Sequence, residues 1–319
     1  MRKLQFIAAL AALGSGVGIA HGADMAAKAP MYKAAPLSGC AYDIIRANSQ
    51  ISVDFAATHM DYAEFNQPAA GGVLLAAPGL PQGATLNTEK GWVPGVAVTG
   101  SYMSDCSSTV ANLYLFGRGT YLSGNTDYFV NGPNVSAKDP AKIWDGDFRV
   151  GKGFQVSSNV MLTPYFGAGI HSWNRTISAF PTGALIEEYR HGYAGAGLLV
   201  QFAVARGVVL SGYGLGGSTF NSEMNFNPNT PVNAATLGPN HTFALGNSTI
   251  VKAGGSIDYA LTDAWHLNAG IDYTYFKYGA SRMELLPAFG TFEPPSRTTN
   301  ITATVGVGYS FGGPVVAKY

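Results

Sequence analysis

Residues able to carry out acid–base chemistry are few in this chain of 319 residues. The strongest grouping is Asp145-Gly146-Asp147, followed later in the chain by His171 and His191. Two carboxylates and a histidine can activate water for hydrolysis. However, no Asp-x-His pair accompanies either histidine, and the nearest acid is Glu188, three residues before His191. The sequence also lacks HExxH, Gly-x-Ser-x-Gly and Gly-rich phosphate-loop motifs. We therefore expect no catalytic residue, no enzymatic activity, no cofactor and no metal site.

The composition limits the class of protein. Lys and Arg number 19, Asp and Glu also number 19, and charged residues are 12% of the chain, about half the usual share. This balance gives no electrostatic footprint for nucleic acid, so we expect no nucleic-acid partner. Hydrophobic residues make up 47%, which excludes a disordered, highly charged protein.

The N-terminus has the pattern of a secretion signal. Arg2 and Lys3 precede an apolar run over residues 4–13, and Ala20-His21-Gly22 supplies small residues at a cleavage site. We assign residues 1–22 to a signal peptide and residues 23–50 to an Ala/Pro-rich periplasmic lead-in. The lead-in is predicted to be flexible and to lie in an oxidising compartment.

The rest of the chain alternates between apolar and polar residues with the period of a β-strand. The C-terminal stretch shows this most clearly, with Val305, Val307 and Tyr309 on one face and Thr304, Gly306 and Gly308 on the other. Ten such strands are predicted, near residues 51–60, 92–103, 110–122, 143–156, 160–173, 187–203, 207–221, 248–260, 265–281 and 298–311.

A soluble β-sandwich would alternate too, but three features favour a membrane barrel. The polar face is rich in Gly, Thr, Ser and Asn, with few Lys or Glu, and aromatic residues end the apolar face. Short links alternate with long ones near 61–91, 123–142, 174–186, 222–247 and 282–297. In hydrocarbon every backbone polar group must be paired, and a closed barrel achieves this. The sequence therefore predicts an all-β, antiparallel, up-and-down transmembrane β-barrel over residues 51–319, with periplasmic short turns and extracellular long loops.

Two terminal segments resemble a known family. The stretch ADMAAKAPMYKAAP and the ending TATVGVGYSFGGPVVAKY are similar to those of porin-family outer-membrane β-barrel proteins of Gram-negative bacteria. In that family the aromatic-rich last strand is recognised by the barrel assembly machinery, which implies a role for Phe311 or Tyr319. The chain departs from the family by continuing for eight residues after Phe311, so both candidates stay open. The resemblance implies an outer-membrane location, and outer-membrane lipid, lipopolysaccharide and the assembly machinery as partners. We expect a monomer.

Charged residues on the inward faces are candidate lumen residues: Asp54, Arg118, Asp147, Arg149, Lys252, Asp258 and Asp272. They could form a constriction that selects solutes, or they could pair with one another and plug the lumen. The plug is favoured because a ten-stranded barrel is only slightly wider than an eight-stranded one, which side chains fill. Inward glycines at 167, 169, 195 and 197 could leave space or accommodate Tyr165 and Tyr193. His266 is expected to be hydrogen-bonded and not metal-bound.

The two cysteines are predicted to form a disulfide. Cys40 precedes the first strand and Cys106 lies in the first short turn, so both lie on the periplasmic side of the barrel. An exported chain with two cysteines favours pairing.

These patterns predict a porin-family surface or envelope component, with slow passage of small solutes as a further expectation. One alternative is an outer-membrane enzyme similar to the omptin proteases, whose site sets an Asp pair opposite an Asp–His pair at the extracellular rim. Another is an adhesin or ligand-binding surface protein that acts through its long loops.

Overall fold

The structure is a computed structural model that describes residues 39–73, 75–131, 135–178, 184–285 and 290–311. The predicted signal peptide (1–22), the first part of the predicted lead-in and Tyr319 lie outside the described residues.

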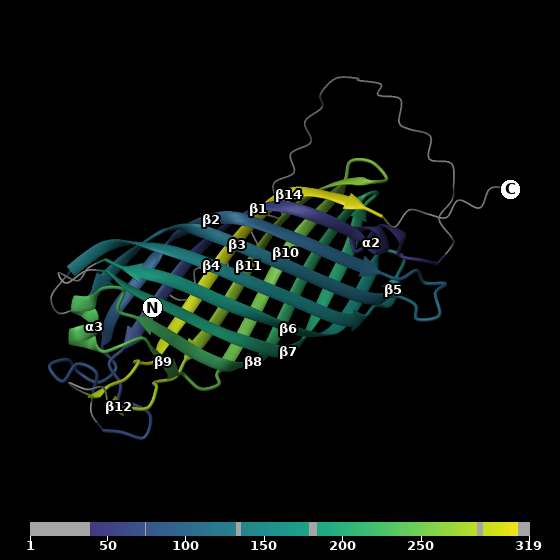
Figure 1. The fold of residues 1–319 in the computed structure, drawn as a ribbon. Coiled ribbons are helices and arrows are strands. Elements are labelled where there is room, and N and C mark those ends of the chain that lie inside the picture. Colours follow the sequence, from purple (N-terminus) through teal and green to yellow (C-terminus); the bar gives the residue numbers. More distant parts are fainter. Residues whose placement is uncertain (1–38, 74, 132–134, 179–183, 286–289, 312–319) are drawn as a thin grey trace, which may run out of the picture. The chain divides into compact units, whose positions relative to one another are not determined.

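The described chain forms a closed antiparallel barrel of ten strands, as predicted (Figure 1). The strands are β1 (Gln50–Phe65), β2 (Thr85–Met103), β3 (Leu113–Val130), β4 (Val135–Lys152) continued by the short β5 (Phe154–Ser157), β6 (Val160–Ile177), β7 (Leu185–Ala205), β8 (Val208–Asn227), β10 (Thr249–Ala260), β11 (Trp265–Tyr278) and β14 (Ser296–Ser310).

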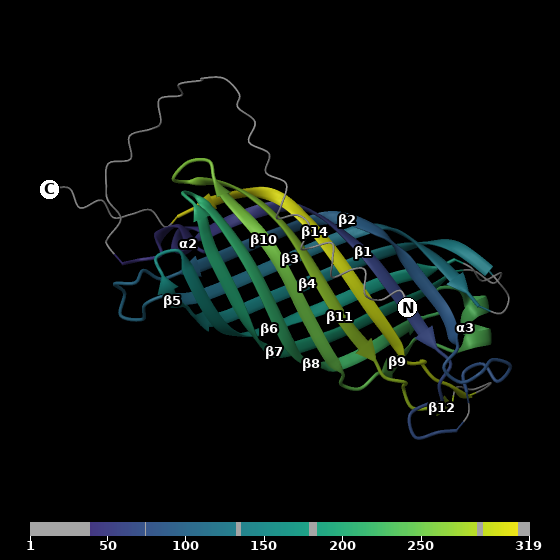
Figure 2. The same ribbon diagram turned by 180° about the vertical axis from the view of Figure 1, so that it is seen from behind.

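The first and last strands close the barrel. β1 pairs with β14 from Gln50 opposite Ser310 to Glu64 opposite Ser296, and with β2 on its other side. Figure 2 shows the barrel from behind, with β14 lying between β1 and β11. Closure leaves no unpaired sheet edge, which is what a hydrocarbon environment requires.

The alternation of the sequence becomes the two faces of the barrel wall. Outward side chains form an exposed apolar belt that includes Phe55, Ile271 and Val305, which are 57–59% exposed. Trp265 and Tyr309, also outward, form an edge-to-face ring pair near the short turns, with centroids 5.3 Å apart. Among the described residues, no helix is both long and apolar enough to cross a membrane.

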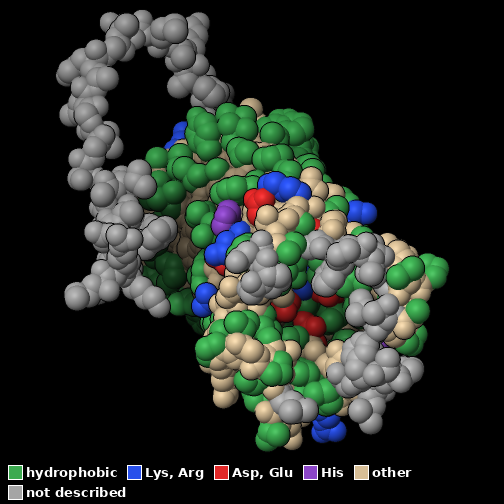
Figure 3. Space-filling view, turned by 90° about the vertical axis from the view of Figure 1, so that its left-hand side faces the viewer, with side chains coloured by type: hydrophobic (Ala, Val, Ile, Leu, Met, Phe, Trp, Pro, Cys, Tyr) green, Lys and Arg blue, Asp and Glu red, His purple; other side chains and the backbone are tan. Residues whose placement is uncertain are grey.

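The strands extend farther at the long-loop end than the sequence predicted. β1 continues to Phe65 where the prediction stopped at residue 60, and β4 begins at Val135 where the prediction began at 143. The loops there carry α3 (Pro231–Leu237), β9 (His241–Ala244), which pairs with β8, and the hairpin of β12 (Glu284–Leu285) and β13 (Gly290–Thr291). Figure 3 views this end and shows Asp and Glu side chains at the floor of a hollow between the loops.

A short helix, α2 (Tyr42–Ala47), lies at the short-turn end of the barrel (Figure 1). The prediction of a flexible lead-in up to residue 50 is therefore wrong over these residues. Ile44 is fully buried and Ile45 nearly so, and they pack with Met103 and Leu199 from the inner face of the strands. The apolar side chains explain why this segment folds, since leaving them in water would cost about 1.5–3 kcal/mol each.

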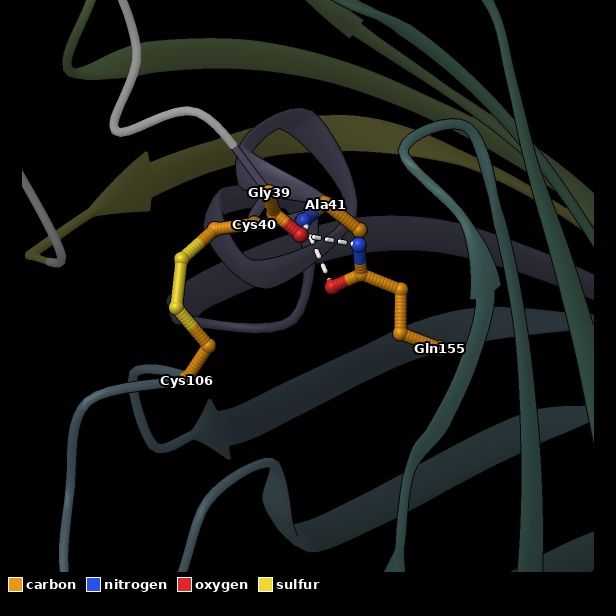
Figure 4. Close-up of a disulfide and its surroundings, with 5 residues drawn as sticks. All are labelled: Gly39, Cys40, Ala41, Cys106 and Gln155. Atoms are coloured by element: carbon orange, nitrogen blue, oxygen red, sulfur yellow. Dashed lines mark hydrogen bonds between the residues drawn. A yellow bond between two sulfur atoms is a disulfide. The ribbon is translucent and has the colours of Figure 1, made fainter.

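The predicted disulfide between Cys40 and Cys106 is present and ties α2 to the β2–β3 turn (Figure 4). The Cα atoms of the two cysteines are 6.0 Å apart. Gln155, at the end of β5, accepts a hydrogen bond from the backbone N–H of Ala41 at 3.1 Å and donates one to the carbonyl of Gly39. Two neighbouring regions of the barrel end therefore hold the start of α2.

Candidate functional site

All seven predicted lumen charges lie inside the barrel, and five of them form one ionic layer. Asp147 accepts hydrogen bonds from Arg149 at 3.1 Å and from Lys252 at 2.8 Å. Arg118 donates to Asp272 across the lumen at 2.8 Å. We call Arg118, Asp147, Arg149, Lys252 and Asp272 the middle layer. Its three cations and two carboxylates are paired with one another, and tyrosine hydroxyls accept or donate the remaining bonds.

Aromatic rings fill the space around the middle layer. The Arg149 guanidinium lies 4.0 Å from the ring centroid of Tyr213 and 4.6 Å from that of Phe116. Two of the four inward glycines accommodate tyrosine rings. A Cβ atom added at Gly197 would lie 2.5 Å from Tyr165, and one at Gly169 would lie 2.5 Å from Tyr193.

The other two predicted charges lie nearer α2. Ser52 donates to Asp54 at 3.0 Å. Asp258 accepts a hydrogen bond from Gln50 at 2.8 Å and contacts His266 Nδ1 at 2.7 Å. Gln50 also donates to the carbonyl of Ala47 at 2.7 Å, so this polar group holds the C-terminal end of α2.

Two lumen cavities stand out among the described residues. One of about 130 Å³ lies between α2 and the middle layer and is lined by polar groups that include Asp54, Asp258 and Thr304. Another of about 60 Å³ lies beside the middle layer and is lined by His171, His191 and Lys252. A water molecule needs about 10–15 Å³ of such space, so both cavities have room for water.

Asp145 and the two histidines approach one another across neighbouring strands. Asp145 Oδ1 lies 2.7 Å from His171 Nδ1, and His191 Nδ1 lies 2.7 Å from the Tyr278 hydroxyl. The search for an Asp-x-His pair along the sequence missed the Asp145–His171 contact, because the two residues face each other on β4 and β6. Trp173 and Tyr189 are each at most 1% exposed and follow these histidines on β6 and β7 toward the long loops. The contact is therefore inside the barrel and not at its rim.

A second ionic group lies farther toward the long loops and was not predicted. Arg175 donates to Glu64 at 2.9 Å, to Glu89 at 3.1 Å and to Glu187 at 2.6 Å. The rings of Tyr62, Trp173 and Tyr189 surround its guanidinium, with centroids 4.9–5.2 Å away. We call Arg175, its three glutamates and Glu293 the outer layer.

The outer layer contains more acid than base. Tyr189 Oη lies 2.6 Å from Glu293 Oε1 and 3.3 Å from Glu187 Oε2, and its single proton can be donated to only one of them. Burial of Glu293, together with the nearby carboxylates of Glu64 and Glu187, raises the pKa of Glu293 well above its usual range. Burial therefore favours the protonated form of Glu293.

One sequence signal could have indicated the outer layer. Glu64, Glu89 and Arg175 fall in segments predicted to be long loops, although each continues the alternation of the adjacent strand. Glu89 and Glu64 lie 86 and 111 residues from Arg175 in the chain. A single sequence does not specify pairings between residues so far apart. Among the described residues, no group of three or more His, Cys, Asp or Glu side chains is arranged to hold a metal ion.

The fold matches a known class of structures. The outer-membrane protease OmpT from Escherichia coli matches with a TM-score of 0.51 and 13% identity, over 82% of this chain and 96% of that one. The fold is that of an outer-membrane β-barrel. Its exposed apolar belt suits a lipid environment, and the fold is like that of the outer-membrane proteins of Gram-negative bacteria. At this identity the likeness concerns the fold alone.

Other outer-membrane β-barrels match with lower TM-scores. OprG from Pseudomonas aeruginosa has a TM-score of 0.33 and 12% identity over 84% of this chain and 99% of that one. The attachment invasion locus protein Ail of Yersinia pestis has a TM-score of 0.27 and 12% identity over 83% and 99%. No protein-family model and no curated protein matches the sequence.

Proposed function

We propose that this outer-membrane β-barrel is a closed surface component of the envelope and not an open diffusion pore. The observation that carries the proposal is that three obstructions occupy successive levels of the lumen. Helix α2 packs against inward side chains at the periplasmic end, the middle layer crosses the centre, and the outer layer fills the extracellular end. Among the described residues, cavities of about 130 and 60 Å³ lie between these levels. This arrangement supports entry of water and opposes passage of sugars or amino acids.

The proposal can be tested by solute uptake into liposomes that contain the purified barrel. Vesicles with the wild-type protein should not swell in an iso-osmotic pentose solution. Because the obstructions are in series, removing α2, replacing Arg149→Ala or replacing Trp173→Ala should each leave the vesicles closed. Only the combined variant should allow swelling. Swelling of the wild-type vesicles would contradict the proposal and would favour the slow-passage alternative.

The Asp145–His171 contact favours a second candidate function, an enzyme with a hydrolytic centre. A carboxylate that orients a histidine can make that histidine a general base. The buried rings of Trp173 and Tyr189 argue against an enzyme. A peptide would have to pass these rings to reach the Asp145–His171 contact from the long-loop end. An assay of peptide cleavage decides between the two functions. Activity that Asp145→Asn abolishes, in a variant that still folds, would replace the closed-barrel proposal with the enzyme.

A closed lumen leaves the long loops as the part of the protein that meets the medium. We therefore propose that any ligand contact of the surface component is made by these loops. Shortening the segment between β8 and β10, which carries α3 and β9, should remove such binding and leave the barrel folded. Binding that survives shortening of each long loop in turn would contradict this placement.

A further inference from the structure

Two basic residues on the outer wall are placed against each other. Lys277 on β11 and Arg297 on β14 are direct cross-strand partners, and both are exposed. They have the outward parity of the lipid-facing residues Ile271 and Val305 on the same strands. Figure 2 shows these two strands side by side.

The two bases lie where the apolar belt ends. Along β11 the outward positions run from Trp265 to Tyr275, ten residues later, and Lys277 is the next. Ten residues at about 3.3 Å each, tilted by about 45°, cover about 23 Å along the membrane normal. This is close to the height of the apolar band of such barrels, about 25 Å. Lys277 and Arg297 are therefore level with the headgroups of the outer leaflet.

This pair departs from the pairing of other outward bases near the same rim. Lys90 contacts Asp61 at 2.9 Å, Lys138 contacts Asp127, and Arg190 contacts Glu223, each on the neighbouring strand. Within the described part of the chain, no carboxylate forms an ion pair with Lys277 or Arg297. Like charges directly opposite each other on a sheet destabilise it. An anion that bridges the two would remove that repulsion.

Neighbouring rings give the site a shape that suits a lipid. The Arg297 guanidinium lies 5.5 Å from the ring centroid of Phe65, and Lys277 Nζ lies 5.9 Å from that of Tyr275. The cations are thus held beside aromatic surface that continues into the lipid-facing belt. A guanidinium binds phosphate oxygens through two parallel hydrogen bonds, and an ammonium adds a compact charge.

We propose that Lys277 and Arg297 form a binding site for the phosphate of a phosphorylated lipid in the outer leaflet. Charge complementarity favours this occupant: two cations with no ion-pair partner among the described residues meet a group that carries at least one negative charge. The site depends on the outer-membrane location and is independent of whether the lumen is closed.

Lipid binding to the full-length barrel in detergent, measured by native mass spectrometry, tests the proposal. The probe is diphosphorylated lipid A, and the comparison lipid is the same molecule without its phosphates. Each basic residue near an anionic surface contributes about 1 kcal/mol, so Lys277→Gln and Arg297→Gln should each weaken binding about fivefold. The double variant should lose about thirtyfold, and Lys277→Arg combined with Arg297→Lys should retain binding. Lys90→Gln is the matched control, because that lysine is already paired with Asp61.

Several outcomes would overturn the site. The first is that the double variant binds lipid A as tightly as the wild type does. The second is that Lys90→Gln weakens binding as much as Lys277→Gln or Arg297→Gln. The third is that the dephosphorylated lipid binds as tightly as lipid A. Displacement of lipid A by inorganic phosphate at low concentration would show that the site takes free phosphate and not a lipid. A wild-type dimer that the double variant lacks would show that a second copy covers these residues.

Discussion

The middle and outer layers of the lumen are both ionic, but they balance their charges differently. In the middle layer, three cations meet two carboxylates, and Asp147 has two basic partners. In the outer layer a single cation, Arg175, serves three carboxylates. The fourth, Glu293, contacts the hydroxyl of Tyr189. If Asp147 in the middle layer loses one basic partner, it keeps the other. If the outer layer loses Arg175, its glutamates have no other cation within that layer.

The two layers also lie at different levels of the barrel. The middle layer includes Asp272, which follows the lipid-facing Ile271 in the chain, so it lies within the membrane. Burying an unpaired charge is costly, and the charges of this layer are paired with one another. The outer layer lies where the strands continue beyond the predicted belt. Excess acid is accommodated there because burial raises the pKa of Glu293 and favours its protonated form.

Replacing Arg175 should have the largest effect on stability. Arg175→Met leaves Glu64, Glu89 and Glu187 without their shared cation, and breaking a buried ion pair in this way costs about 3–5 kcal/mol. Unfolding in urea, followed by tryptophan fluorescence in lipid vesicles, measures the loss. The control is Arg190→Met, whose exposed pair with Glu223 should matter by less than about 1 kcal/mol. Equal small losses would mean that Arg175 does not hold the outer layer together.

The levels of the two layers can be tested from the outside of the barrel. Ile271→Arg puts a charge beside the middle layer on the lipid side and should cost about 2–4 kcal/mol near the midplane. Thr176→Arg, next to Arg175 on β6 and facing outward, should cost at most about 1 kcal/mol because that level lies at or above the membrane surface. The same unfolding experiment compares them. Equal costs would place both layers at one depth.

Removing one cation from the middle layer should cost less than removing Arg175. Lys252→Met takes away a hydrogen bond to a charged group, worth about 1.5–3 kcal/mol, but Asp147 keeps its contact with Arg149 at 3.1 Å. A double-mutant cycle of Lys252 with Asp147 separates this contact from the rest. If Lys252→Met lowers the free energy of unfolding as much as Arg175→Met does, the second basic partner of Asp147 does not protect the middle layer.

Glu293 should give the smallest effect and a characteristic pH dependence. Its pKa is raised in the folded protein, so between the unfolded and folded pKa values the folded state binds more protons. The free energy of unfolding should therefore fall as the pH rises above about 4.5. Glu293→Gln copies the protonated acid and should remove this slope while changing stability by about 1 kcal/mol or less at acidic pH. The pH dependence of urea unfolding measures both. An unchanged slope in the variant would show that Glu293 does not carry the shared proton.

The sequence predicted the middle layer much better than the outer layer, for a physical reason. Alternation assigns a face to every residue of a membrane strand, so Asp147, Lys252 and Asp272 were placed inward without knowledge of their partners. Glu89 and Arg175 lie in strand extensions beside residues typical of loops: Lys90-Gly91 follows Glu89, and Asn174 precedes Arg175. Beyond the membrane the belt no longer enforces an apolar outer face, and the signal that marks a strand is lost. Helix α2 was missed because six residues are too short for a helical period to be recognised.

Single-channel recording in planar lipid bilayers tests the closed lumen most directly. With the disulfide intact, the wild-type barrel should insert without stepwise conductance in concentrated potassium chloride, since α2 and both ionic layers remain in place. Loss of α2 alone should also give no steps, because the middle and outer layers still obstruct the lumen. Regular conductance steps from the wild-type protein, lost on heat denaturation, would contradict the closed barrel and establish an open pore.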